Sequence, residues 1–265
     1  MNLEEFRATL LIVGAAKKGK TEFLLSAPDP LFWQWDANAA GPELCGHPVI
    51  DFTAMEPKDA WKLFSEIVLP ATYNRDLTKL QQYVTPKGTD LSKIKSICHD
   101  SETFCFETMQ DAIPIPRTGK GEPDTYKWYR ILREVKKQQY YRCTGIARPF
   151  PGDPARPRYN FVAACHMKEE YMDVAGTDKR ILSRWVPAIE GSFKDKLPAY
   201  TNCLFWADSK REGDKTTYFL HTKSPDKFRS ADDSIGGRGP FKVLPPRIDN
   251  NWQALLEGWG VGQAK

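Results

Sequence analysis

The stretch TLLIVGAAKKGKTEFLL, residues 9–25, decides the fold that this chain is expected to adopt. Its apolar run at 10–13 predicts a buried strand, and residues 22–25 predict the start of a helix. The turn between them fits the pattern G-x-x-x-x-G-K-[ST], filled here by Gly14, Ala15, Ala16, Lys17, Lys18, Gly19, Lys20 and Thr21. A strand, this turn and a helix in that order are typical of a loop that cradles phosphate groups.

The residue types in this turn suit a bound triphosphate. Glycines let backbone N–H groups converge on phosphate oxygens, and the helix N-terminus adds partial positive charge. Lys20 is expected to reach the β- and γ-phosphates and the Thr21 hydroxyl to hold Mg²⁺, with Glu22 at the edge of the same site. A glycine-rich turn with an ordinary surface lysine is the simpler alternative. The flanking strand and helix favour nucleotide binding.

Composition sets wide limits on the class of protein. The chain has 265 residues, 41% hydrophobic and 27% charged, which is ordinary for a globular α/β protein with a full core. A net charge of +4 permits a nucleic-acid partner without requiring one. Six scattered cysteines without a C-x-x-C pair suit a reducing cytoplasm. Glu4 and Glu5 precede the first apolar run, and no segment is long enough to span a bilayer, so neither a secretory leader nor a membrane association is expected.

Apolar strand-like runs alternate with helical patterns along the chain. This alternation predicts a mostly parallel central sheet flanked by helices. Strands are expected at 31–35, 48–52, 94–99, 159–165, 202–207 and 216–221, and helices at 57–69, 101–112, 126–141 and 252–259. Residues 208–214 predict the turn of a C-terminal antiparallel hairpin, and residues 167–198 predict an irregular loop. Without a repeat or a long linker, residues 1–265 are expected to form a single domain, with its core at about 8–222 and a C-terminal loop and short helix at 223–265.

Three residues at or beyond strand ends are candidates for the chemistry of phosphoryl transfer. Asp100 follows the strand expected at 94–99 and is the candidate metal ligand, although it could simply cap the following helix. Asp36 follows an aromatic strand and could polarise an attacking water, or close a turn. His166 ends the most apolar strand and could detect the γ-phosphate, or merely hydrogen-bond its neighbours. In a parallel sheet these positions face the crevice at the carboxyl ends of the strands.

The loop expected after His166 combines cations with aromatic rings. Lys168, Lys179, Arg180 and Arg184 alternate there with Tyr171 and Trp185. Cations beside aromatic faces are typical of single-stranded nucleic acid binding. Four acidic residues dilute this charge, so a solvated face is the competing interpretation.

Taken together, the order of these parts resembles the RecA-type ATPase core, a P-loop NTPase fold. Within it, the chain is similar to the small phage ATPases known as Sak-type single-strand annealing and recombination proteins. The matching segments are 11–21, 31–36, 97–101 at the Walker B position, 161–168 at the sensor strand, and then 187–191, 196–198 and 227–229.

The resemblance implies an ATP-binding and ATP-hydrolysing protein that acts on single-stranded DNA in phage recombination, annealing or replication, in the cytoplasm of the host cell. It implies that the His166 strand lies between the strand of the P-loop and that of Asp100, and that residues 168–185 form a DNA-binding loop. Lys227 and Arg229 would reach ATP in a neighbouring subunit of a ring or filament. A single-strand binding protein is a further implied partner.

Three departures from the family leave alternatives open. The P-loop interior at 15–18 carries extra positive charge, and the Walker B strand is unusually polar. The second strand ends in Asp36-Ala37-Asn38, where the family often places a glutamate, so hydrolysis is expected to be slow or absent. One alternative is a P-loop kinase for a small molecule, with Arg142, Arg148, Arg156 and Arg158 as a lid. The other is a nucleotide-switched scaffold without turnover.

Overall fold

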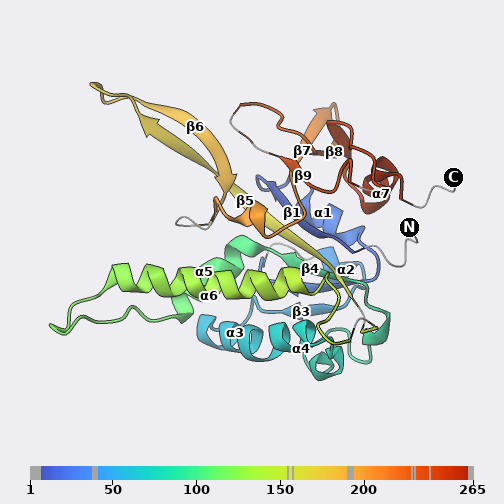
Figure 1. Cartoon of the computed structure of the whole chain (residues 1–265), viewed down its shortest axis with the longest axis horizontal. Helices are drawn as coiled ribbons and strands as arrows, with labels where there is room; N and C mark the ends of the chain where they lie inside the picture. Colours follow the sequence, from blue (N-terminus) through green and yellow to red (C-terminus); the bar gives the residue numbers. More distant parts are fainter. Residues whose placement is uncertain are drawn as a thin grey trace.

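The computed structural model describes residues 7–37, 41–153, 155–156, 158–189, 194–227, 229, 231–238 and 240–261. Within these residues the chain forms a central sheet with helices packed against it (Figure 1). The prediction of a mixed α/β fold with a mostly parallel central sheet is confirmed. Asn38, residues 190–191 and Phe228, which entered the sequence analysis, lie outside the described residues.

The order of the strands in the sheet is β10-β8-β7-β1-β5-β4-β2-β3, with β6 paired to β5 and β9 to β7. The pairs from β7 through β3 are parallel, and those involving β6, β8, β9 and β10 are antiparallel. β5 thus lies between β1 and β4, as the resemblance implied. The bounds are β1 (Thr9–Gly14), β2 (Pro30–Gln34), β3 (Val49–Asp51), β4 (Ser96–Asp100), β5 (Asn160–Asp173), β6 (Arg180–Pro187), β7 (Cys203–Glu212), β8 (Lys215–His221), β9 (Asp232–Asp233) and β10 (Arg247–Asp249).

The helices form near the segments in which helical spacing occurs. They are α1 (Lys20–Leu25), α2 (Gly41–Leu44), α3 (Pro57–Leu63), α4 (Leu69–Tyr73), α5 (Glu102–Ala112), α6 (Thr125–Gly145) and α7 (Trp252–Trp259). A π-helical turn, η1 (Phe64–Val68), joins α3 to α4, and the short 3-10 turns are η2 (Leu77–Leu80), η3 (Leu91–Lys93) and η5 (Leu197–Ala199). Asp124 caps α6 by accepting a hydrogen bond from the backbone N–H of Lys127, which fixes where this long helix begins.

Side chains of the buried strands alternate between the two faces of the sheet. In β1, Leu11 and Val13 belong to a core shared with α3–α4, α5 and α6, whereas Leu10 and Ile12 belong to a core shared with α1 and α7. All four are fully buried. Burial on both faces explains why the run 10–13 is continuously apolar, as is typical of a central parallel strand.

The polar residues in and beside β4 have local structural reasons. His99 is fully buried among aromatic rings, with Trp33 at 5.7 Å and Phe64 at 5.9 Å between ring centroids. Ser96 accepts a hydrogen bond of 3.1 Å from the Asn160 side chain on β5. Lys95 lies outside the strand and pairs with Asp29 at 2.8 Å. The strand is therefore a buried central strand despite its composition.

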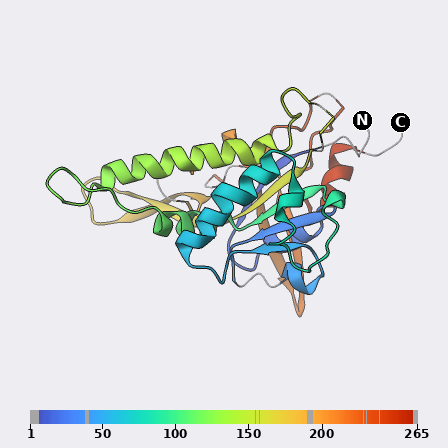
Figure 2. The same ribbon diagram turned by 90° about the horizontal axis from the view of Figure 1, so that it is seen from below.

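Two hairpins are longer than the sequence pattern predicted. Residues 168–187, expected to be irregular, continue β5 and form β6, and together they make an arm that projects from the body (Figures 1 and 2). Likewise β7 runs through the segment expected to be a turn, and the hairpin turns at Gly213 and Asp214. Both segments were wrongly predicted to be loops. These strands extend beyond the core, where both faces carry polar side chains, so the alternation of apolar and polar residues that marks a strand is missing.

None of the described helices is both long and apolar enough to cross a membrane. The six cysteines are free thiols, of which Cys45 is exposed and the others are buried. No group of three or more His, Cys, Asp or Glu side chains among the described residues is arranged to hold a metal ion.

Candidate nucleotide-binding site

The P-loop connects β1 to α1 at the carboxyl edge of the parallel strands. Its backbone is left-handed at Lys17 and at Gly19, with φ values of 60° and 81°. A Cβ on Gly19 would also lie 2.7 Å from the Asn250 side chain, and one on Gly14 would lie 2.8 Å from the carbonyl oxygen of Ala207 on β7. Close packing thus requires both glycines, and the left-handed backbone also favours glycine at position 19. Ala16, Lys17 and Glu22 are exposed at the surface.

Lys20 is buried, with 7% of its surface exposed, and it lies against its own loop. Its ammonium donates hydrogen bonds to the carbonyl oxygens of Gly14 at 3.1 Å and Ala15 at 2.7 Å. Burial lowers the pKa of Lys20, an effect that the nearby carboxylate of Asp100 opposes. The ammonium is therefore at the mouth of the loop, where phosphate oxygens would compete with these carbonyls.

Thr21 and Asp100 meet across the site. The Thr21 hydroxyl at the start of α1 donates a 2.7 Å hydrogen bond to the Asp100 carboxylate at the end of β4. Asp100 is only 2% exposed, and burial raises its pKa to about 6, with the Thr21 hydrogen bond lowering it in part. A hydroxyl and a carboxylate are oxygen ligands of the kind that Mg²⁺ prefers, usually completed by phosphates and water. The two side chains fit such an ion.

Asp36 and His166 form the second pair of facing side chains. His166 lies beside Gly14 in the register of β5 against β1, and its Nε2 is 3.6 Å from Oδ2 of Asp36. The His166 backbone N–H donates to the Thr103 hydroxyl at 3.0 Å. Burial and then the Lys20 charge lower the pKa of His166, and Asp36 opposes them, so the imidazole is neutral at pH 7. Residues from β1, β2, β4 and β5 thus converge on the P-loop.

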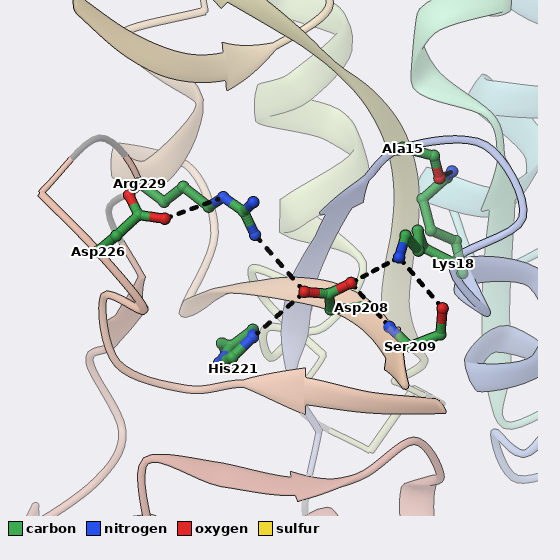
Figure 3. Close-up of polar contacts among 8 residues, drawn as sticks. Ala15, Lys18, Asp208, Ser209, His221, Asp226 and Arg229 are labelled. Atoms are coloured by element: carbon green, nitrogen blue, oxygen red, sulfur yellow. Dashed lines mark hydrogen bonds and ion pairs between the residues drawn. The ribbon is translucent and has the colours of Figure 1, made fainter. Parts of the chain in front are cut away.

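Asp208, on β7 beside the P-loop, contacts two cations and a histidine (Figure 3). It accepts from Lys18 at 2.8 Å on one oxygen, and its other oxygen lies 3.7 Å from His221 and 3.8 Å from Arg229. Lys18 also donates to the Ser209 hydroxyl at 3.2 Å. The positive charge of Lys18 is therefore paired within the chain, whereas Lys17 is exposed.

Sequence reasoning missed three residues that shape the site. Asp208 was interpreted as part of a turn. Asn250 donates a 2.7 Å hydrogen bond to the Gly19 carbonyl, and the ring of Tyr218 packs over the same glycine. No pattern near the P-loop points to them, because they come from β8 and from the residue after β10. Only the position of Asp208 directly after an apolar strand run carried a usable signal.

The four nucleic-acid candidates lie on the β5–β6 arm. Arg184 pairs with Glu170 and with Asp195, each at 2.8 Å, and Arg180 pairs with Asp173 at 3.3 Å. Lys168 and Lys179 form no ion pair with another described residue, and Lys179 is exposed whereas Lys168 is partly buried. The arm therefore carries cations, but acidic neighbours on the same strands offset much of their charge.

The two finger candidates differ in their surroundings. The Arg229 side chain lies over the Trp185 ring at 5.2 Å and pairs with Asp226 at 3.5 Å, in addition to its contact with Asp208. Lys227 is exposed in the segment after β8. Arg229 is thus tied to the P-loop of its own chain through Asp208 and Lys18.

No family model matches the sequence, and no curated protein matches it. Among solved structures the chain is similar to a prototypical ATPase from the type III secretion system of pathogenic bacteria, with 13% sequence identity and a TM-score of 0.42. The alignment covers 75% of this chain and 51% of that ATPase, so the chain spans about half of its length.

Proposed function

We propose that this chain is a P-loop ATPase of RecA-like architecture that binds ATP with Mg²⁺ and couples it to single-stranded DNA. The observation that carries the nucleotide site is the hydrogen bond from Thr21 on the P-loop helix to the buried Asp100 at the end of β4. A buried carboxylate with a raised pKa, aimed at a P-loop hydroxyl, suits a site that a divalent cation completes. The position of β5 between β1 and β4 supports the RecA-like assignment.

In this proposal each residue has one task in ATP hydrolysis. Lys20 leaves its loop carbonyls for the β- and γ-phosphates, and Thr21 and Asp100 hold Mg²⁺, which neutralises charge on the phosphates when bound. Asp36 orients the attacking water. His166 is neutral and donates a hydrogen bond to the γ-phosphate. It also lies close to Asp36, so it faces both the γ-phosphate and the residue that orients the water.

Coupling to DNA follows from the continuity of β5. His166 and Lys168 belong to the same strand, which continues into the arm with Lys179, Arg180 and Arg184. A shift of His166 toward the γ-phosphate would therefore be transmitted directly to the base of the arm. A depression on the arm, lined by Tyr171 and by charged residues that include Lys168, Arg180 and Arg184, suits stacking and phosphate contacts.

We further propose that the protein assembles into a ring or filament in which Arg229 or Lys227 reaches the ATP of a neighbouring subunit. In the unassembled chain Arg229 contacts Asp208. This ion pair would have to break before Arg229 could reach the ATP of a neighbouring subunit. A single-strand binding protein as partner and a location in the host cytoplasm remain proposals that rest on the resemblance alone.

The kinase alternative receives less support from the positions of its arginines. Arg156 contacts the carbonyl of Asn74, and the carbonyl of Arg158 accepts from Arg7, next to the start of β5. These groups lie near the amino ends of the strands, whereas the P-loop lies at the carboxyl ends. A lid over the nucleotide would require them at the other edge.

An ATPase assay with and without single-stranded DNA tests the proposal. Stimulated turnover with Mg²⁺ would support it, and the Thr21→Val variant should lose the stimulated rate. Turnover only with a small acceptor would favour the kinase, and ATP binding without turnover would favour the scaffold. Duplex DNA of the same sequence is the matched control, because the arm is expected to read unpaired bases.

A further inference from the structure

Helix α6 exposes a basic and aromatic face that the nucleotide site does not use. Its inward residues, such as Leu132 and Tyr140, are buried in the core, and its outward residues are exposed. Because side chains four apart lie above one another on a helix, Tyr129, Arg133, Lys137 and Tyr141 form one row. Arg130, Glu134, Gln138 and Arg142 form the row beside it. We name the basic and aromatic members of the two rows the α6 stripe, and it comprises Tyr129, Arg130, Arg133, Lys137, Tyr141 and Arg142.

The charge of this surface is one-sided. The exposed cations of α6 are Lys127, Arg130, Arg133, Lys137 and Arg142, and the helix carries one acidic residue, Glu134. Glu134 lies 3.3 Å from Arg133 and 3.9 Å from Lys137, and the other three exposed cations of α6 outnumber it. On residues 168–185, by contrast, four acidic residues balance the four basic ones. A polyanion would therefore gain more electrostatic attraction from α6 than from the arm.

A cavity lies at the C-terminal end of the stripe. It has a volume of about 460 Å³ and is lined by Tyr73, Lys137, Gln138, Tyr141, Arg142 and Tyr200, from α4, α6 and the residue after η5. This volume is within the range of small-ligand sites. Tyr141 is 62% exposed at its rim. Aromatic rings, an amide and two cations around one cavity suit a planar heterocycle with a phosphate attached.

We propose that the α6 stripe and this cavity form a binding surface for a single-stranded nucleic acid, with one unpaired base in the cavity and its flanking phosphates on Lys137 and Arg142. This inference rests on the proposed function in that a single strand is the ligand. The exposed aromatic residues of α6 are tyrosines, whose hydroxyl groups suit a hydrated polyanion better than a lipid interior. From Tyr129 to Tyr141 the stripe extends about 18 Å along the helix.

The test measures binding of fluorescent oligo-dT and oligo-rU by anisotropy over a range of salt concentrations. Tyr141→Ala removes one stacking ring without changing charge, and it should weaken binding about tenfold with an unchanged salt slope. Lys137→Glu with Arg142→Glu should weaken binding by more than tenfold and reduce the slope of log K against log salt by about 1.4. The matched control is Lys79→Glu with Lys93→Glu, the same charge change on η2 and η3, expected to stay within about threefold.

The outcomes separate this inference from the proposed function. Wild-type affinity in both α6 variants, together with weaker binding by Lys179→Ala with Arg180→Ala, would overturn the α6 surface and leave the arm as the DNA site. Competition by duplex as strong as by single strands would overturn the base cavity. If neither oligomer binds the wild type, the single-strand function and this surface are both wrong. An ATP titration on each variant verifies that the fold is intact, and dT against rU identifies the preferred strand.

Discussion

Replacing Asp100 by asparagine should stabilise the protein when no nucleotide or metal is bound. Burial raises the pKa of this carboxyl from 3.8 to about 6, while the Thr21 hydrogen bond lowers it in part. Each pKa unit corresponds to about 1.4 kcal/mol, so ionising Asp100 in the folded chain costs about 3 kcal/mol at neutral pH. Asparagine removes that charge, and its amide oxygen can still accept from Thr21.

The sign of the effect gives a pH window. Because the folded-state pKa lies above the unfolded value, the favourable contribution of Asp100 is complete below about pH 4 and is lost as the pH rises through about 6. Asp100→Asn should therefore match the wild type near pH 4 and exceed it by up to about 3 kcal/mol above pH 7. Magnesium-dependent stabilisation by ATP should be lost in the same variant.

Urea unfolding monitored by tryptophan fluorescence between pH 4 and 8, in EDTA, measures this difference. The exposed Asp178→Asn substitution on the arm is the control and should leave the free energy of unfolding nearly unchanged at every pH. A gain for Asp100→Asn that does not vary with pH, or a variant less stable than the wild type at pH 7, would refute the reasoning.

Three further changes test other parts of the account. His166→Ala should lower the ATPase rate about 10²-fold, typical of losing one transition-state hydrogen-bond donor, and shift the affinity for ATP little, as rapid-quench and titration measurements would show. Asp208→Asn removes the partner of Lys18 and should reduce stability by about 1 kcal/mol, a modest figure because the pair is partly exposed; an unaltered thermal midpoint would mean that the pair contributes nothing. Lys136 is paired with Glu102 and both are fully buried, so Lys136→Met should cost about 3–5 kcal/mol. Adding Glu102→Leu should recover most of that loss in the same unfolding experiment.

The strand, turn and helix at 9–25 were predictable because their signal is local. Apolar residues, glycines and the lysine–threonine pair lie next to one another in the chain, and they fill a buried strand, a turn and the first residues of a helix. Asp36, Asp100 and His166 were also accessible, since the residues that end parallel strands meet at one edge of the sheet. These side chains face one another because of the order of the strands in the sheet. The sequence predicted that order only through the resemblance.

The remaining features depend on contacts between distant segments. Asn250 reaches Gly19 from the far end of the chain, and no local pattern marks it. The extensions of β5 and β7 were hidden because their polar side chains look like those of a loop, whereas the antiparallel hydrogen bonds with β6 and β8 hold them extended. Asp208 lies 2.8 Å from Lys18 but far from it in the sequence, so no local pattern explains this additional lysine of the P-loop.

Calorimetric titration of ATP and Mg²⁺ into the wild type and into Lys20→Ala tests the central claim most directly. The account predicts one site per chain in the wild type and an affinity at least tenfold weaker in the variant, because the ammonium that neutralises the terminal phosphates is gone. Equal affinity in the two proteins, or no heat of binding in the wild type, would contradict it.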